Sequence, residues 1–326
     1  MTTSLPASPS VAQHFGEALS ARIAAHWSQP KLLPADAERP WVIPPETEVL
    51  LTTPSPAWAR APRRRPDAWP AQLKWVQLAS AGIDFYPDWL LQGTRVTCGR
   101  GLTADAIAEF ALTAILAHEK DFHRIFVRDA ESWQPRSLGL VAGKTVAVLG
   151  YGAIGRRVAL LAAAVGLRVK VLRRRASTDR ATALCLESGV TAVPDISSLL
   201  RDADHLILAV PLTRETRHIV GPDLLARAKP GLHIVNVARG SLIDQAALLE
   251  ALKSGQVGAA TLDVTDPEPL PTGHPLYAHP KVRISPHISW NTGDALDRVL
   301  VRFLDNLDRF LRGDVLLAEV DPARGY

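Results

Sequence analysis

Three segments in the last third of the chain carry side chains suited to acid–base and anion chemistry. Arg239 lies in "NVARGSLID", Glu268 in "LDVTDPEPL" and His287 in "RISPHISW". Each segment contains or follows an apolar run that is typical of a buried strand. The carboxyl ends of parallel strands meet at one edge of a sheet, where open α/β folds bind their ligands. The spacing therefore predicts that the three side chains converge.

Such a set could deliver a proton to an oxygen that gains negative charge. Histidine titrates near neutral pH, so His287 could act as proton donor and acceptor. Glu268, hydrogen-bonded to the ring, would select its tautomer, and Arg239 would bind a carbonyl oxygen and a carboxylate. Taken singly, the histidine could be structural, the glutamate an exposed turn residue and the arginine an ion-pair partner. Their occurrence together at successive strand ends favours a catalytic site.

A glycine-rich segment, "KTVAVLGYGAIGRRVALL", places Gly150, Gly152 and Gly155 in the pattern GxGxxG. It follows a β-branched strand and opens a helix, which is the context that a dinucleotide-binding loop requires. Gly150 permits the tight turn, Gly152 lets a pyrophosphate approach the backbone, and Gly155 allows helix and strand to pack closely. Backbone N–H groups at Ala153 and Ile154, where the helix begins, would bind the phosphates. A glycine turn without a ligand is the alternative.

Three arginines, Arg173, Arg174 and Arg175, stand at the end of the next strand, in "VKVLRRRAS". This position of a dinucleotide-binding fold meets the adenosine ribose, and an acidic residue there favours NAD(H). A guanidinium instead pairs with phosphate oxygens. We therefore expect Arg173 and Arg174, with Arg175 as a helper, to select NADP(H). NAD(H) remains the alternative cofactor if Arg173 stacks on the adenine and the other two are solvated.

Regular elements must position these segments. From residue 145 onward, apolar strand patterns alternate with helical patterns, which predicts a parallel, doubly wound sheet. Helical patterns also cover residues 104–126 and 292–312. The first hundred residues contain short apolar runs between Pro- and Gly-rich turns, typical of an α/β domain. Residues 1–15 are rich in Ser, Ala and Pro and are expected to be a poorly ordered end.

Composition narrows the class of protein. A chain of 326 residues, 47% hydrophobic and 21% charged, suits a globular protein of two domains. Its net charge is +4, and the arginine clusters lack the interleaved aromatic residues of a nucleic-acid-binding surface. Cys98 and Cys185 lack metal-binding spacing, and no apolar run could cross a bilayer. We expect no metal, nucleic acid or membrane partner, and a cytoplasmic location.

Over nearly its whole length, and most strongly at residues 75–290, the chain resembles the D-isomer-specific 2-hydroxyacid dehydrogenases. The segments that carry the resemblance include "KWVQLASAGID", "GKTVAVLGYGAIGRRVA", "NVARGSLIDQAALLEAL", "LDVTDPEPL" and "SPHISW". It implies an α/β protein with two doubly wound parallel-sheet domains. A Rossmann cofactor domain at residues 104–288 would be inserted into a flavodoxin-like substrate-binding domain at residues 1–103 and 289–326. It also implies a homodimer with contacts near Trp133.

The resemblance assigns roles to individual residues. Arg239, Glu268 and His287 match the catalytic Arg, Glu and His of the family. The implied cofactor contacts beyond the glycine loop and the arginines are Pro211 at the adenosine, Val237 and Ala238 beside the nicotinamide, and Asp263 at its carboxamide. The implied substrate contacts are the backbone N–H groups of Ser80, Ala81 and Gly82 for the carboxylate, with Arg239, His287 and Trp290. Trp290 could equally be a packing residue.

The activity implied is an oxidoreductase acting on the CH–OH group of donors, with hydride transfer between NAD(P)H and a small 2-keto acid or D-2-hydroxy acid. Glyoxylate and hydroxypyruvate reductases that favour NADPH carry similar arginines, so these two substrates are the first expectation. One alternative is an NAD-dependent dehydrogenase for a bulkier 2-keto acid. Another is a dinucleotide-sensing dimeric scaffold of the corepressor type, against which the complete Arg, Glu and His set argues.

Overall fold

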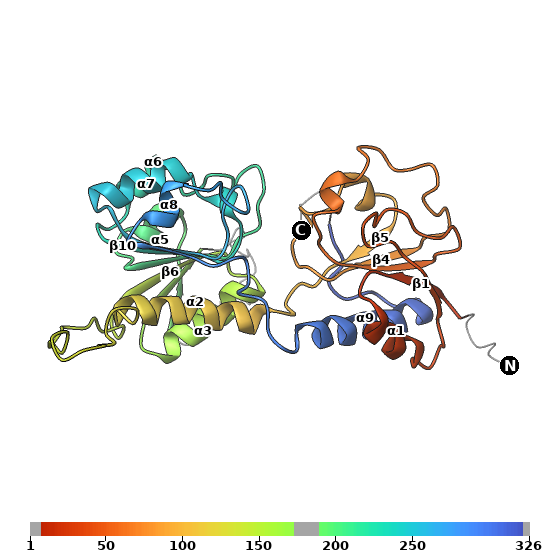
Figure 1. Ribbon diagram of the computed structural model, residues 1–326, viewed down its shortest axis with the longest axis horizontal. Helices are drawn as coiled ribbons and strands as arrows, with labels where there is room; N and C mark the ends of the chain where they lie inside the picture. Colours follow the sequence, from red (N-terminus) through yellow and green to blue (C-terminus); the bar gives the residue numbers. More distant parts are fainter. Residues whose placement is uncertain (1–7, 173–188, 322–326) are drawn as a thin grey trace. The chain divides into compact units, whose positions relative to one another are not determined.

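The computed structural model describes residues 8–172 and 189–321, so Arg173, Arg174, Arg175 and Cys185 lie outside the described residues. The chain divides into two compact units (Figure 1). Met1–Leu102 and Thr292–Tyr326 make the first, which we call the terminal unit, and Thr103–Asn291 make the second, which we call the central unit. No helix in the described parts of the chain combines the length and apolar character needed to span a membrane.

The described part of the terminal unit contains a five-stranded parallel sheet in the order β2-β1-β3-β4-β5. Its strands are β1 (Ser10–Gln13), β2 (Lys31–Leu33), β3 (Val49–Thr52), β4 (Trp75–Leu78) and β5 (Arg95–Thr97). Helices α1 (Glu17–Ala24) and α9 (Ala295–Arg312) pack on one face of it through an apolar cluster in which Trp75 stacks on Phe303. Alternate side chains of β3 point into two different clusters, as the two-residue period of a strand requires.

The expectation of a poorly ordered N-terminal end is wrong for Ser10–Gln13. These residues form β1, which lies between β2 and β3, and Val11 and Ala12 are fully buried. Each side of β1 pairs with a strand much later in the sequence, from Lys31 or Val49 onward. Order here comes from non-local backbone pairing, which the local composition does not reveal.

The described part of the central unit contains a seven-stranded parallel sheet in the order β12-β11-β10-β9-β6-β7-β8. Its strands are β6 (Thr145–Leu149), β7 (Arg168–Leu172), β8 (Val190–Ala192), β9 (His205–Leu208), β10 (Leu232–Asn236), β11 (Val257–Leu262) and β12 (Val282–Ile284). The order reverses between β9 and β6, which makes this the switch point where such sheets bind ligands. The predicted doubly wound, parallel-sheet architecture is confirmed in both units.

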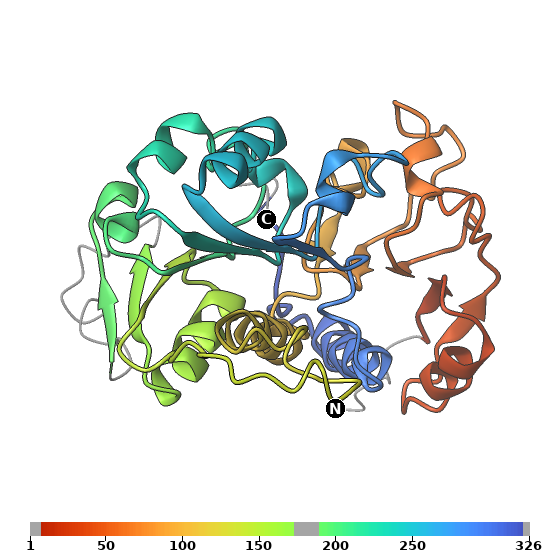
Figure 2. The ribbon, with the colours of Figure 1, turned by 60° about the vertical axis from the view of Figure 1, so that its left-hand side comes forward.

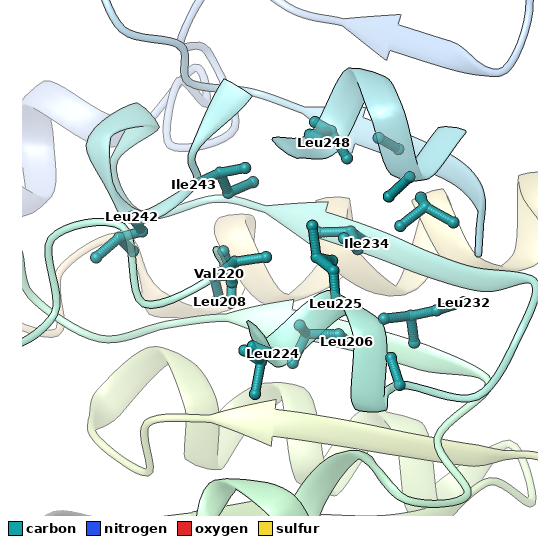
Figure 3. Close-up of a cluster of buried hydrophobic side chains, with 14 of the residues drawn as sticks. Leu206, Leu208, Val220, Leu224, Leu225, Leu232, Ile234, Leu242, Ile243 and Leu248 are labelled. Carbon is teal, nitrogen blue, oxygen red and sulfur yellow. The ribbon is translucent and has the colours of Figure 1, made fainter. Parts of the chain in front are cut away.

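Helices cover both faces of the central sheet (Figure 1 and Figure 2). Helices α2 (Ala104–Glu119) and α3 (Ala153–Ala164) bury their apolar faces together on one side. The other side carries α5 (Ile196–Leu200), α6 (Pro222–Arg227), α7 (Gln245–Ser254) and α8 (Pro275–Ala278). Figure 3 shows the cluster beneath them, where Leu225 of α6 and Leu248 of α7 lie in one cluster with the strand residues Leu232 and Ile234. Residues of β9 and β10 are thus anchored in this cluster.

The first predicted helix is shorter than its sequence pattern. The pattern runs to residue 126, whereas α2 ends at Glu119 and Asp121 adopts a left-handed backbone with φ 43°. The Glu119 carbonyl accepts a hydrogen bond from the backbone N–H of Gly139 at 2.8 Å. The chain therefore leaves the helix axis, and residues 120–140 form an irregular segment that returns to the same point.

A buried group of titratable side chains lies where β9 and β10 begin. Both carboxylate oxygens of Glu119 accept hydrogen bonds from Lys144 Nζ at 2.6 Å. The fully buried His205 lies with Nε2 3.4 Å from Glu119 Oε1, and its Nδ1 lies 3.2 Å from Nδ1 of His233, whose ring stacks on His118. Burial opposes the charged carboxylate, but its interactions with His205 and Lys144 outweigh that cost and lower the pKa of Glu119 to about 2.

We expect Glu119→Gln to lower the melting temperature at pH 7 and to flatten its dependence on pH. Because the pKa of Glu119 falls from 4.5 to about 2 on folding, its carboxylate stabilises the fold above pH 4.5, and this contribution disappears as the pH falls toward 2. The full contribution is about 3 kcal/mol. Thermal unfolding at pH 7 and pH 3 measures it, with the exposed Glu250→Gln as control. Equal pH dependence in wild type and Glu119→Gln would contradict the assignment.

Candidate active site

The glycine loop follows β6 and opens α3 as the sequence pattern predicts. Gly150 has φ 103°, and a Cβ there would lie 2.5 Å from the Ala209 carbonyl oxygen. A Cβ on Gly155 would lie 1.9 Å from the Gly150 carbonyl oxygen, so helix and loop touch through backbone alone. A Cβ on Gly152, by contrast, would meet nothing within 4 Å. The backbone is therefore in close contact at Gly150 and Gly155, whereas the space beside Gly152 is open. The loop lies at the N-terminus of a helix that begins at Ala153. This arrangement fits a dinucleotide pyrophosphate.

Of the residues predicted to contact the adenosine, Pro211 lies within the described part of the chain. Pro211 is exposed and follows β9, the strand beside β6, with its carbonyl accepting a hydrogen bond from Thr216 Oγ1 at 2.7 Å. It therefore stands at the same sheet edge as the glycine loop. β7 ends at Leu172, and the arginines expected to bind a 2′-phosphate lie outside the described residues.

His287 and Glu268 form a hydrogen-bonded pair. His287 Nδ1 lies 2.9 Å from Glu268 Oε2, while Glu268 Oε1 accepts a hydrogen bond from the backbone N–H of Thr265 at 3.1 Å. Both carboxylate oxygens are thus oriented by the chain. The two side chains are 28% and 37% exposed, so the pair is open enough to meet a ligand. His287 adopts a left-handed backbone with φ 55°, which is rare outside glycine and points to a local constraint.

That constraint comes from Asp263, at the end of β11. Asp263 is 1% exposed, and its carboxylate accepts three hydrogen bonds, from Ser285 Oγ at 2.6 Å and from the backbone N–H groups of Ile288 and Ser289 at 2.9 and 3.0 Å. Its carbonyl accepts a fourth from the His287 N–H at 2.8 Å. Asp263 therefore holds the loop on both sides of the histidine.

Trp290 closes the same loop. Its indole N–H donates to the His287 carbonyl oxygen at 2.8 Å, and 41% of the residue is exposed. The hydrogen bond supports a packing contribution to the loop, and the exposed ring surface is compatible with a contact to a ligand. The structure thus shows a contact of Trp290 within the loop, and its contact with a substrate stays a prediction.

Arg239 follows β10 and is partly buried, and its Nη1 donates to the Ala238 carbonyl oxygen at 2.6 Å. A Cβ on the next residue, Gly240, would lie 2.0 Å from the carbonyl carbon and oxygen of Thr265. The backbone after Arg239 therefore packs directly on the loop that carries Glu268. Polar contacts support this packing, because Ser241 donates to the carboxylate of Asp266.

The sheet order brings the three predicted catalytic residues to one edge. They follow β10, β11 and β12, which are consecutive neighbours in the parallel sheet. Val237 and Ala238 lie immediately before Arg239 on the same edge, Val237 buried and Ala238 partly exposed. Ser285 and Asn236 were not among the predicted site residues, although both make hydrogen bonds that shape these loops. The signal that could have found them is a polar residue directly at the end of an apolar strand.

The predicted carboxylate-binding residues lie in the terminal unit, directly after β4. Ser80 Oγ donates to the Gly82 carbonyl oxygen at 2.7 Å, and the Ser80 carbonyl accepts the N–H of Gly99 at 2.7 Å. Ala81, at the tip, is exposed. The loop is thus a compact turn at the carboxyl end of a strand. Within the described parts of both units, no group of three or more His, Cys, Asp or Glu side chains is arranged to hold a metal ion.

The chain is similar to known proteins in both sequence and fold. Residues 112–289 match the family described as D-isomer specific 2-hydroxyacid dehydrogenase, NAD binding domain. The chain is 35% identical to an uncharacterized protein of Corynebacterium melassecola, over 79% of this chain and 85% of the other. It is 36% identical to a glyoxylate reductase of Aeropyrum pernix, over 68% of each chain. A D-isomer specific 2-hydroxyacid dehydrogenase from Xanthobacter autotrophicus Py2, solved in complex with NADPH and MES, superposes with a TM-score of 0.82 at 27% identity, covering 98% and 100% of the two chains.

Proposed function

Because this chain belongs to the family of D-isomer specific 2-hydroxyacid dehydrogenases, we propose that it reduces a small 2-keto acid to the D-2-hydroxy acid, with NADPH as preferred cofactor. As a member of this family, the protein is an oxidoreductase that acts on the CH–OH group of its donors, and it contains a dinucleotide-binding domain. The observation that carries the proposal is the hydrogen bond of 2.9 Å between His287 and Glu268. These two residues follow β12 and β11, and Arg239 follows the adjacent strand β10.

The residues divide the work of carbonyl reduction. A bound reduced dinucleotide supplies the hydride. With Nδ1 of His287 engaged by Glu268, we assign Nε2 as the atom that delivers the proton to the carbonyl oxygen. The carboxylate stabilises the positive charge on the ring before the transfer. The Arg239 guanidinium binds the carbonyl oxygen and the substrate carboxylate, and stabilises the alkoxide that develops as hydride arrives.

We assign cofactor binding to the central unit and substrate-carboxylate binding to the terminal unit. The proposed cofactor contacts are Gly150, Gly152, Ala153, Ile154, Gly155, Pro211, Val237, Ala238 and Asp263. Asp263 has one further lone-pair direction on its buried carboxylate for a carboxamide N–H, beyond the three hydrogen bonds it already accepts. The backbone N–H groups of Ser80, Ala81 and Gly82 are the proposed carboxylate contacts, with Trp290 as a further contact to the substrate side chain.

Glyoxylate and hydroxypyruvate are the proposed substrates. Support comes from the glyoxylate reductases among the relatives, such as that of Aeropyrum pernix. The test is kcat/KM for NADPH and for NADH at saturating glyoxylate and then hydroxypyruvate. Turnover with NADPH preferred supports the proposal in full. Better use of NADH would make NADH the cofactor in place of NADPH. Turnover only with bulkier 2-keto acids would replace the proposed substrates. Cofactor binding without any turnover would favour a dinucleotide-sensing scaffold instead.

The cofactor preference is proposed to reside in Arg173 and Arg174, with Arg175 as a helper. Support comes from their place directly after β7 in the sequence, and from the NADPH bound to the Xanthobacter autotrophicus protein. We expect Arg173→Asp with Arg174→Ala to move the ratio of kcat/KM for NADPH over NADH toward NADH by about 100-fold, the loss of one or two charge-assisted bonds. Arg63→Asp with Arg64→Ala, in the other arginine cluster, is the control. An unaltered ratio would show that these arginines do not bind the phosphate.

We also propose that the chain forms a homodimer through residues 120–140. Figure 1 shows this segment projecting from the end of α2, and it exposes Phe122, Phe126, Trp133 and Leu140 by 50% to 75%. Such a concentration of exposed apolar side chains is unusual on a monomer. Sedimentation equilibrium should give twice the 35.3 kDa of one chain. Phe126→Glu with Trp133→Glu should give a monomer, whereas Val315→Glu, which replaces an equally exposed valine, should not. A monomeric wild type would contradict the proposal.

A further inference from the structure

A fully buried asparagine lies where β10 ends. Asn236 is 0% exposed, and its side-chain amide is hydrogen-bonded in both directions. Oδ1 accepts the backbone N–H of Ala238 at 3.1 Å, and Nδ2 donates to the backbone carbonyl oxygen of Arg239 at 2.8 Å. Burying an amide is costly unless it is bonded in this way. Both of its partners belong to the turn that carries Arg239.

The two bonds lie on either side of the arginine. The first fixes the peptide group that ends in the Ala238 N–H, and the second fixes the peptide group that begins with the Arg239 carbonyl. Between them, the Ala238 carbonyl accepts the bond of 2.6 Å from Arg239 Nη1. The guanidinium is therefore tied to a carbonyl whose neighbouring peptide groups are both held by one side chain.

That side chain is itself held by the sheet. Asn236 pairs with Leu208 of β9 and with Leu262 of β11, and its carbonyl accepts the N–H of Asp263 at 2.9 Å. Its Cα is thus fixed on both sides by a parallel ladder, and its two ladder partners belong to the buried apolar cluster of the central sheet. From this anchor the amide reaches only two and three residues along the chain. Its geometry transmits the rigidity of β10 to the turn.

We propose that Asn236 is a positioning residue for Arg239, which sets the direction of the guanidinium toward the substrate. This inference rests on the proposed role of Arg239 in 2-keto acid reduction. The requirement for asparagine is chemical, because one short side chain must accept from one peptide group and donate to another. Aspartate would keep the first bond and set a carboxylate against the Arg239 carbonyl oxygen. Alanine would lose both bonds.

A double-mutant cycle tests the proposal. Wild type, Asn236→Ala, Arg239→Ala and the double variant are compared by kcat and KM for glyoxylate with NADPH. We expect Asn236→Ala to lower kcat/KM for the keto acid by about 100-fold, chiefly through a higher KM, because misplacement by about 1 Å has an effect of this size. The KM for NADPH should not change. In the Arg239→Ala background, Asn236→Ala should lower kcat/KM by less than about threefold, since residues that act as a unit are not additive.

The matched control is Asn306→Ala in the terminal unit. Asn306 is also 0% exposed and also binds backbone in both directions, at the N–H and the carbonyl of Leu317. Its loss should lower the melting temperature without a change in the KM for keto acid at 25 °C. An equal loss from Asn236→Ala in both backgrounds would overturn the positioning role. Wild-type activity in Arg239→Ala would instead overturn the proposed role of Arg239, and absence of keto acid reduction in the wild type would overturn the proposed function. If Asn236→Ala does not fold, Asn236→Asp, which keeps the volume and one bond, enters the same cycle.

Discussion

Replacing His287 by alanine is expected to lower kcat for 2-keto acid reduction by about 1000-fold, within the range for loss of a general acid. The ring of His287 is hydrogen-bonded to Glu268, and alanine has no proton to deliver in its place. Affinity for NADPH should stay the same, because His287 is not among the proposed contacts of the dinucleotide. Steady-state kinetics measure the first effect, and fluorescence titration with NADPH measures the second.

The control for this variant has to match its backbone. His287 adopts φ 55°, and removing its side chain could relax the loop as well as remove the proton donor. His218 is another histidine in the left-handed region, with φ 52°, and it is exposed. His218→Ala should therefore keep wild-type turnover. Unchanged turnover in His287→Ala would remove the ring from the mechanism, and a similar loss in both variants would attribute the effect to the backbone.

Replacing Arg239 by alanine is expected to raise KM for the keto acid and to lower kcat, with a combined loss in kcat/KM of about 1000-fold. Both parameters should change because one guanidinium is proposed to bind the carboxylate in the ground state and the alkoxide in the transition state. Arg239→Lys should recover only part of the loss, because an ammonium keeps the charge and lacks the planar pair of donors.

The control for Arg239 lies on the adjoining loop. Arg217 is exposed and forms an ion pair with Asp266, two residues before Glu268. Arg217→Ala removes a guanidinium that contacts the same loop without a proposed role in substrate binding, so its kcat/KM should remain close to that of wild type. A normal rate in Arg239→Ala would refute the assignment of that residue. A rise in KM alone would restrict its role to binding of the carboxylate.

Several features of this protein depend on local chemistry, and the sequence alone determined them. The glycine pattern at Gly150, Gly152 and Gly155 can be recognised in the sequence because a Cβ at Gly150 or Gly155 would lie less than 3 Å from backbone atoms. The strands of the central sheet can be recognised because strands buried on both faces of an α/β fold are continuous apolar runs rich in β-branched residues. Once those strands are parallel, their ends must lie at one edge. The sequence therefore predicts that Arg239, Glu268 and His287 follow strand ends at one edge of the sheet.

Other features depend on partners distant in the sequence, and only the tertiary structure decided them. Residues 10–13 form an inner strand because β2 and β3 flank them, whereas their composition suggested a poorly ordered end. The pairing of Glu119 with Lys144 and His205 joins three segments that are distant in the sequence, so no local sequence pattern predicts it. The side chains of Asn236 and Asp263 form hydrogen bonds with the loops that follow the strands. These bonds form only because the neighbouring strands set the direction of those loops. Side-chain types identify which chemistry is available, and the packing of strands against one another decides where that chemistry is held.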